Sequence, residues 1–77
     1  MKVTIVKEDG LVIVNDEVRL GLDLSGLDSS FRALQWNGEV GDLEEVFDGR
    51  PVNTQITSLT PYQWCIELWQ SASNSAE

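Results

Sequence analysis

The chain has 77 residues, with five Lys and Arg against thirteen Asp and Glu, which gives a net charge of −8. It contains one Cys and no His. These counts exclude an intramolecular disulfide, a Cys-rich or His-ligated metal site, and Ser-His-Asp or Cys-His catalysis. Clustered Lys and Arg contact nucleic-acid phosphates, so their scarcity argues against direct nucleic-acid binding. We therefore expect one small domain that is not an enzyme and needs no cofactor.

The N-terminal part of the chain is predicted to form strands joined by turns. Val3–Val6 is rich in β-branched residues, and Leu11–Val14 is a continuous apolar run. Glu8-Asp9-Gly10 between them has turn chemistry, so the two runs should form a hairpin. From Val18 to Leu24 apolar and polar residues alternate, which predicts a third strand with one face buried.

The central part predicts further antiparallel strands. Phe31–Trp36 and Gly41–Phe47 are separated by Asn37-Gly38, a dipeptide that favours a type I′ turn. Asp48-Gly49 marks the next turn, and Pro51 restricts the segment that follows it to a sheet edge or a loop.

A helix is predicted from Pro61 to Ala72. Thr60 is a candidate N-cap, Pro61 a candidate first helical residue, and Gln63 follows Thr60 by three positions, as in a capping box. The polar residues 73–77 should fray. The expected fold is thus α+β: a single domain over residues 1–72, built from a small antiparallel meander of about four to six strands with one C-terminal helix packed on it.

The apolar residues of the predicted helix form two lines along its surface rather than one. One apolar line, which should pack on the sheet, is formed by Tyr62, Cys65, Ile66 and Trp69. Trp64 and Leu68 form a second line, rotated away from the first. Two interpretations stay open: a curved sheet covers both lines, or Trp64 and Leu68 bind a partner or a second copy of the chain.

The hairpin at Trp36 and Asn37 is a second candidate contact. Trp36 fits a cross-strand aromatic residue of the core, and it also fits a ring exposed to a partner at a hairpin tip. A cluster of acids, Asp42, Glu44, Glu45 and Asp48, is expected to be a solvated face. Glu44 and Glu45 should point to opposite faces of a strand, which argues against a catalytic carboxylate pair.

No metal site and no membrane segment are expected. Residues 23–28 lack the alternating acidic ligands of a calcium loop. The longest apolar run, Leu11–Val14, is far shorter than the ~20 residues that span a bilayer. The N-terminus does not read as a signal peptide. These features favour a protein that stays in a cytoplasm or in a particle assembled there.

Several motifs together resemble a family of small tail or tail-fibre accessory proteins of tailed bacteriophages and prophages. The resemblance covers about Val12 to Trp69. It is carried by Asp23-Leu24-Ser25-Gly26-Leu27-Asp28, Ala33-Leu34-Gln35-Trp36-Asn37-Gly38, Gly41, Glu45, Asp48-Gly49-Arg50-Pro51, Asn53, Ile56-Thr57-Ser58-Leu59-Thr60-Pro61-Tyr62-Gln63 and Trp69.

The resemblance implies a non-enzymatic virion component or assembly chaperone that binds a tail-fibre or baseplate protein. It places the protein in the virion tail, or in the host cytoplasm during assembly, where three-fold or six-fold symmetry favours several copies. Trp64, Leu68, Trp36 and Asn37 are the residues we expect at the contact. The alternative is a small acidic inhibitor that mimics nucleic acid and binds a host defence or DNA-binding protein.

Overall fold

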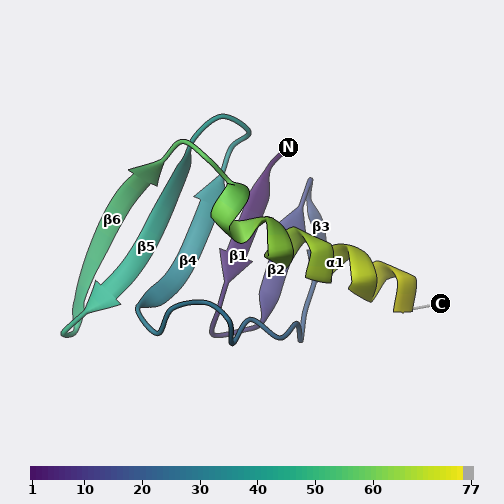
Figure 1. The fold of residues 1–77 in the computed structure, drawn as a ribbon, viewed down its shortest axis with the longest axis horizontal. Coiled ribbons are helices and arrows are strands. Elements are labelled where there is room, and N and C mark those ends of the chain that lie inside the picture. Colours follow the sequence, from purple (N-terminus) through teal and green to yellow (C-terminus); the bar gives the residue numbers. More distant parts are fainter. Residues whose placement is uncertain (76–77) are drawn as a thin grey trace.

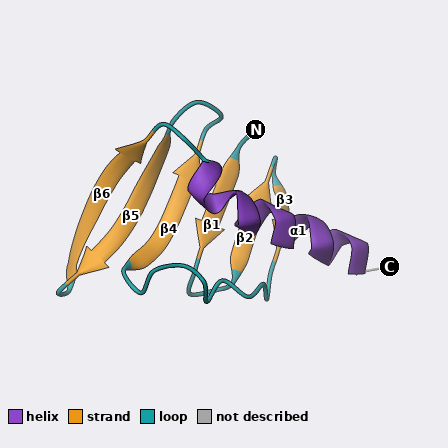
Figure 2. Cartoon of the chain, in the orientation of Figure 1, coloured by secondary structure: helices purple, strands orange, loops and turns teal. Residues whose placement is uncertain are grey.

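A computed structural model describes the fold of residues 1–75 and the side chains of residues 1–72. One antiparallel sheet of six strands, in the order β3-β2-β1-β4-β5-β6, is crossed on one face by a C-terminal helix (Figures 1 and 2). The strands are β1 (Val3–Val6), β2 (Leu11–Val14), β3 (Glu17–Arg19), β4 (Phe31–Trp36), β5 (Gly41–Phe47) and β6 (Arg50–Ile56). The expected α+β class is confirmed.

The core lies between the central strands and the helix. Ile5 on β1 is opposite Val12 on β2 and Leu34 on β4, and all three side chains are fully buried. Apolar side chains two residues apart therefore point to one face, as a pleated strand requires. The helix contributes Cys65 and Ile66 to the same cluster.

The two-residue turns of the sheet are at other positions than Asn37-Gly38, where the sequence predicts one. Asp48 and Gly49, between β5 and β6, have φ of 53° and 77°, and Asn15 and Asp16, between β2 and β3, have φ of 50° and 70°, so both of these turns contain two left-handed residues. The type I′ prediction for Asn37-Gly38 is wrong. Residues 37–40 form a longer loop in which Asn37 Oδ1 accepts the N–H groups of Glu39 and Val40, both at 3.0 Å.

The strand predicted over Val18–Leu24 is also wrong in length and burial. β3 ends at Arg19, and the side chains of Val18 and Leu20 are 49% and 66% exposed. Gly21 adopts a φ of 72°, which breaks the extended chain, and the N–H of Leu22 then donates to Gly10 O at 2.9 Å. The chain turns away from the sheet edge for this reason.

The helix begins with one 3₁₀ turn, η1 (Thr60–Tyr62), and continues as α1 (Gln63–Ser75). Pro61 lies in that first turn, as expected. The capping box is wrong, because no side chain caps η1 and the Thr60 hydroxyl instead accepts a hydrogen bond from the Ser58 hydroxyl at 3.1 Å. The helix continues past Ala72 into the tail predicted to fray, and residues 76 and 77 lie outside the described residues.

Candidate functional site

The first apolar line of the helix packs on the sheet as predicted. Cys65 and Ile66 are 0% and 2% exposed, and Tyr62 and Trp69 pack at the margin of the core. The rings of Tyr62 and Phe31 are tilted, with centroids 5.5 Å apart, a distance typical of aromatic pairs in a core. This face of the helix is therefore used within the chain.

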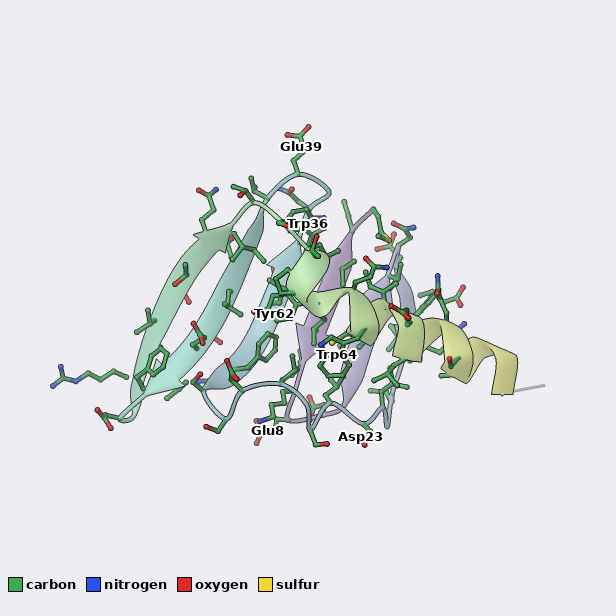
Figure 3. The ribbon with its side chains drawn as sticks, viewed as in Figure 1. Glu8, Asp23, Trp36, Glu39, Tyr62 and Trp64 are labelled. Carbon is green, nitrogen blue, oxygen red and sulfur yellow. The ribbon has the colours of Figure 1, made fainter. Side chains whose placement is uncertain are left out.

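The second line, Trp64 and Leu68, is half-buried, and a loop supplies part of the cover of Trp64. The ring of Trp64 lies against the loop between β3 and β4, so that a Cβ added to Gly26 would be 3.2 Å from Trp64 Cη2 (Figure 3). The same loop buries Leu24 and Leu27. A loop thus supplies cover that neither earlier interpretation included. A partner contact by Trp64 and Leu68 stays a prediction, limited to the surface the loop leaves open.

Trp69 links the helix to the edge strand β3 through two contacts. Its indole N–H donates to the backbone oxygen of Glu17 on β3 at 2.9 Å. The guanidinium of Arg19 lies 4.7 Å from the centroid of the Trp69 ring and pairs with the Glu17 carboxylate. A cation over an indole ring is a favourable contact, so it stabilises the packing of α1 against β3 together with the hydrogen bond.

Trp36 is the cross-strand aromatic residue that one of its interpretations predicted. It is half-buried on the helix side of the sheet and lies over Gly41, its register partner on β5. Asn37 is exposed, and its side-chain oxygen is occupied by the loop. A partner contact at Trp36 and Asn37 stays a prediction.

The helix covers only part of the sheet. It crosses β1, β2 and β3, while the helix side of β5 and β6 has no helix over it (Figure 1). We call this region the open half of the sheet. Phe47 and Val52 are 48% and 41% exposed. Each lies an even number of residues from a core residue of its own strand, Leu43 on β5 and Ile56 on β6, so both point to the helix side. Neither residue was expected in a site.

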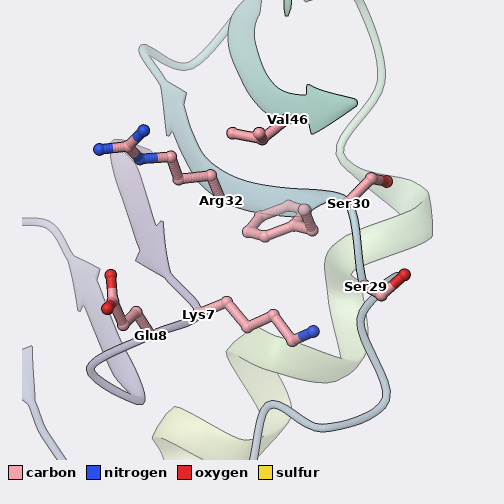
Figure 4. Close-up of a pocket in the computed structure, with 7 residues that line it drawn as sticks. Lys7, Glu8, Ser29, Ser30, Arg32 and Val46 are labelled. Atoms are coloured by element: carbon pink, nitrogen blue, oxygen red, sulfur yellow. The ribbon is translucent and has the colours of Figure 1, made fainter. Parts of the chain in front are cut away.

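A shallow hollow of about 430 Å³ lies where β4 begins, and Val46, the residue of β5 that lines it, is on the face opposite to the open half (Figure 4). Its apolar lining comes from Phe31 and Val46. Its two cations already have partners: Lys7 Nζ donates to Asp28 O at 3.1 Å, and Arg32 Nε lies 3.4 Å from the Glu44 carboxylate. The hollow therefore suits an apolar side chain of a partner better than a phosphate.

The acidic cluster has the arrangement that strand geometry predicts. Asp42 and Glu44 lie on the outer face of β5, whereas Glu45 lies on the opposite face and accepts a hydrogen bond from the Ser30 hydroxyl at 3.0 Å.

Within the described residues, no group of three or more His, Cys, Asp or Glu side chains could hold a metal ion. Burial raises the pKa of Cys65 to about 11, which makes this thiol a poor nucleophile.

Comparisons with known proteins leave the family of the chain open. No protein-family model matches it, and no curated protein or solved structure matches it either. In the described part of the chain, no helix is long and apolar enough to cross a membrane.

Proposed function

We propose that this protein is a non-enzymatic accessory protein of a bacteriophage tail, which binds a tail-fibre or baseplate protein during or after virion assembly. The observation that carries the proposal is the open half of the sheet. A helix that covered the whole sheet would shield Phe47 and Val52, and here both remain accessible on the core side.

The open half has the composition of a docking surface. An aromatic side chain, Phe47, and a β-branched side chain, Val52, are exposed on it. Aromatic residues that enter desolvated pockets contribute much of the binding energy in protein interfaces. The net charge of −8 would steer the protein towards a basic surface on its partner.

The resemblance to phage tail proteins supplies the class of partner. Two of the motifs that carry it border the open half at opposite ends of β5: the Trp36-Asn37-Gly38 loop and the Asp48–Pro51 turn. Motif residues that gather around one accessible surface support a role for that surface in binding.

Recovery from infected cells tests the proposal. A tagged chain should co-purify with a tail-fibre or baseplate protein. Phe47→Ser should weaken that binding by at least roughly 30-fold, which corresponds to a hot-spot loss of about 2 kcal/mol. Leu20→Ser is the matched control, since Leu20 is 66% exposed and lies at the opposite side of the sheet. It should bind like the parent chain.

Two results would contradict the proposal. One is recovery without any tail protein. The other is capture of a host nuclease or polymerase in a complex that dissociates at moderate salt, which is the result the nucleic-acid mimic predicts. The outer face of β5 offers that alternative little support, because Arg32 lies 3.4 Å from the Glu44 carboxylate and interrupts the negative surface.

A further inference from the structure

The two edges of the sheet differ in how far they are protected. β3 has three residues, and Arg19 donates to the outward backbone oxygen of Val18 at 3.5 Å. Trp69 holds α1 against the same edge. β6 has seven residues, and every one except Ile56 is exposed. Proteins usually shorten, cover or charge an exposed edge strand or place a proline on it. In β6 these devices are confined to Arg50 and Pro51, so the unprotected part of the edge, from Val52 onward, points to a pairing partner.

The turn before β6 determines which backbone groups face outward. Asp48 and Gly49 form a two-residue turn, so Phe47 and Arg50 are the hydrogen-bonded pair next to it. The alternation of an antiparallel ladder then directs the polar backbone groups of residues 51, 53 and 55 away from β5. Pro51 is one of these residues, so its missing N–H falls on the free edge and leaves the sheet intact.

The charge distribution favours a second copy of the chain at this edge. The protein carries −8 overall, yet no Asp or Glu occurs from Arg50 to Ile66. Two copies that meet along β6 therefore bring together the edge strand that carries no negative charge, whereas the other edge strand, β3, contains Glu17. Elsewhere two such acidic chains would repel each other more strongly.

We propose that β6 pairs with β6 of a second copy in antiparallel orientation, about a two-fold axis at Asn53. In this register the two Asn53 residues exchange both backbone hydrogen bonds. Gln55 N–H of each copy donates to Pro51 O of the other, whereas Pro51 has no N–H to donate to Gln55 O in return. The free edge is thus complementary to itself, as a two-fold interface requires.

The pairing would also join the side chains on the two faces. On the helix side, Val52 of each copy lies opposite Thr54 of the other, a cross-strand pair of β-branched residues. The two open halves become one continuous surface that carries Phe47 of both copies. The inference goes beyond the tail proposal, because pairing needs no tail protein and is tested on the purified chain alone.

Sedimentation equilibrium tests the dimer. The mass should rise with concentration from 8.6 kDa to twice that value. Asn53→Pro removes an outward N–H and should keep the protein monomeric at concentrations where the parent is dimeric. Val18→Pro is the matched control, since the turn at Asn15 and Asp16 places the Val18 N–H outward on the other edge in the same way. It should dimerise like the parent.

Cross-linking tests the register. Asn53→Cys should oxidise readily to a disulfide-linked dimer, because opposite residues of such a pair have Cα atoms about 5.5 Å apart. Glu39→Cys, on an exposed loop, reports collisions and should cross-link at least tenfold more slowly. Native Cys65 is fully buried and should not compete.

Three results would overturn the inference. They are a monomer at every concentration, a dimer that survives Asn53→Pro, and equal cross-linking rates for Asn53→Cys and Glu39→Cys. Circular dichroism establishes that each variant is folded. If Asn53→Pro does not fold, the cross-linking result decides alone, because Asn53→Cys keeps the backbone donor.

Discussion

The Trp36 ring lies over Gly41 so closely that a β-carbon on residue 41 would be 2.8 Å from Trp36 Cε3. The same β-carbon would be 3.1 Å from the backbone oxygen of Gln35, so movement of the ring alone would not relieve all of the crowding. We expect Gly41→Ala to lower the free energy of unfolding by about 1–3 kcal/mol, the usual cost of overpacking. Urea unfolding followed by circular dichroism measures this loss.

A double-mutant cycle attributes that loss to the ring. In a Trp36→Leu background, Gly41→Ala should cost clearly less than in the parent chain, because the nearest atom has been removed. An equal cost in both backgrounds would show that the backbone of Gln35, rather than the indole, determines the glycine.

The hydrogen bond from Trp69 to β3 gives a second prediction. Trp69→Phe keeps a ring beside Arg19 but removes the N–H that donates to Glu17 O at 2.9 Å. We expect a loss of about 1 kcal/mol in the free energy of unfolding. Hydrogen exchange should also become faster at the β3 amides that bond to β2. An unchanged stability together with unchanged exchange at β3 would contradict this anchoring role.

The strands were predictable where local chemistry alone sets them. Phe31–Trp36 ends before Asn37-Gly38 and Gly41–Phe47 ends before Asp48-Gly49, and the structure has both strands with these bounds. The alternation of apolar and polar residues after Val18 predicted a strand that is too long, because the pattern does not show that Gly21 takes a φ of 72°. Leu20 is consequently exposed.

The surfaces were less predictable, because they depend on contacts between distant segments. The Trp64 ring is covered by a loop at Gly26, which lies 38 positions earlier in the chain. The exposure of Phe47 and Val52 follows from the strand order, which places β5 and β6 beyond the path of the helix. The pattern of residues along the sequence indicates the strands but not the order in which they lie in the sheet.

The turn between β2 and β3 contains a removable strain. Asn15 and Asp16 have φ of 50° and 70°, values that glycine adopts without steric cost. We expect Asp16→Gly to raise the free energy of unfolding, because the relieved strain of a left-handed residue, about 1–2 kcal/mol, exceeds the entropic cost of glycine, about 0.5–1 kcal/mol. Asp9→Gly removes the same charge from a turn position where φ is not positive, and it should not stabilise. Equal effects of the two changes would point to charge rather than backbone conformation.

Burial of Cys65 links stability to alkaline pH. Burial raises the pKa of this thiol from 9.0 to about 11. Between these values the folded chain keeps a proton that the unfolded chain has lost. Stability falls with rising pH wherever the folded state binds more protons, so the loss should begin near pH 9 and level off near pH 11.

Tyr62 adds a second loss at higher pH. Burial chiefly, and then the charges of Glu45 and Asp28, raise the pKa of its hydroxyl above 10.0, so its contribution has the same sign but starts about one unit later. Urea unfolding at several pH values separates the two groups. Cys65→Ala should flatten the decline between pH 9 and 10, while Tyr62→Phe should leave that part unchanged and reduce the decline above pH 10. A Cys65→Ala profile parallel to that of the parent from pH 8 to 10 would mean that the thiol ionises alike in the folded and unfolded chains.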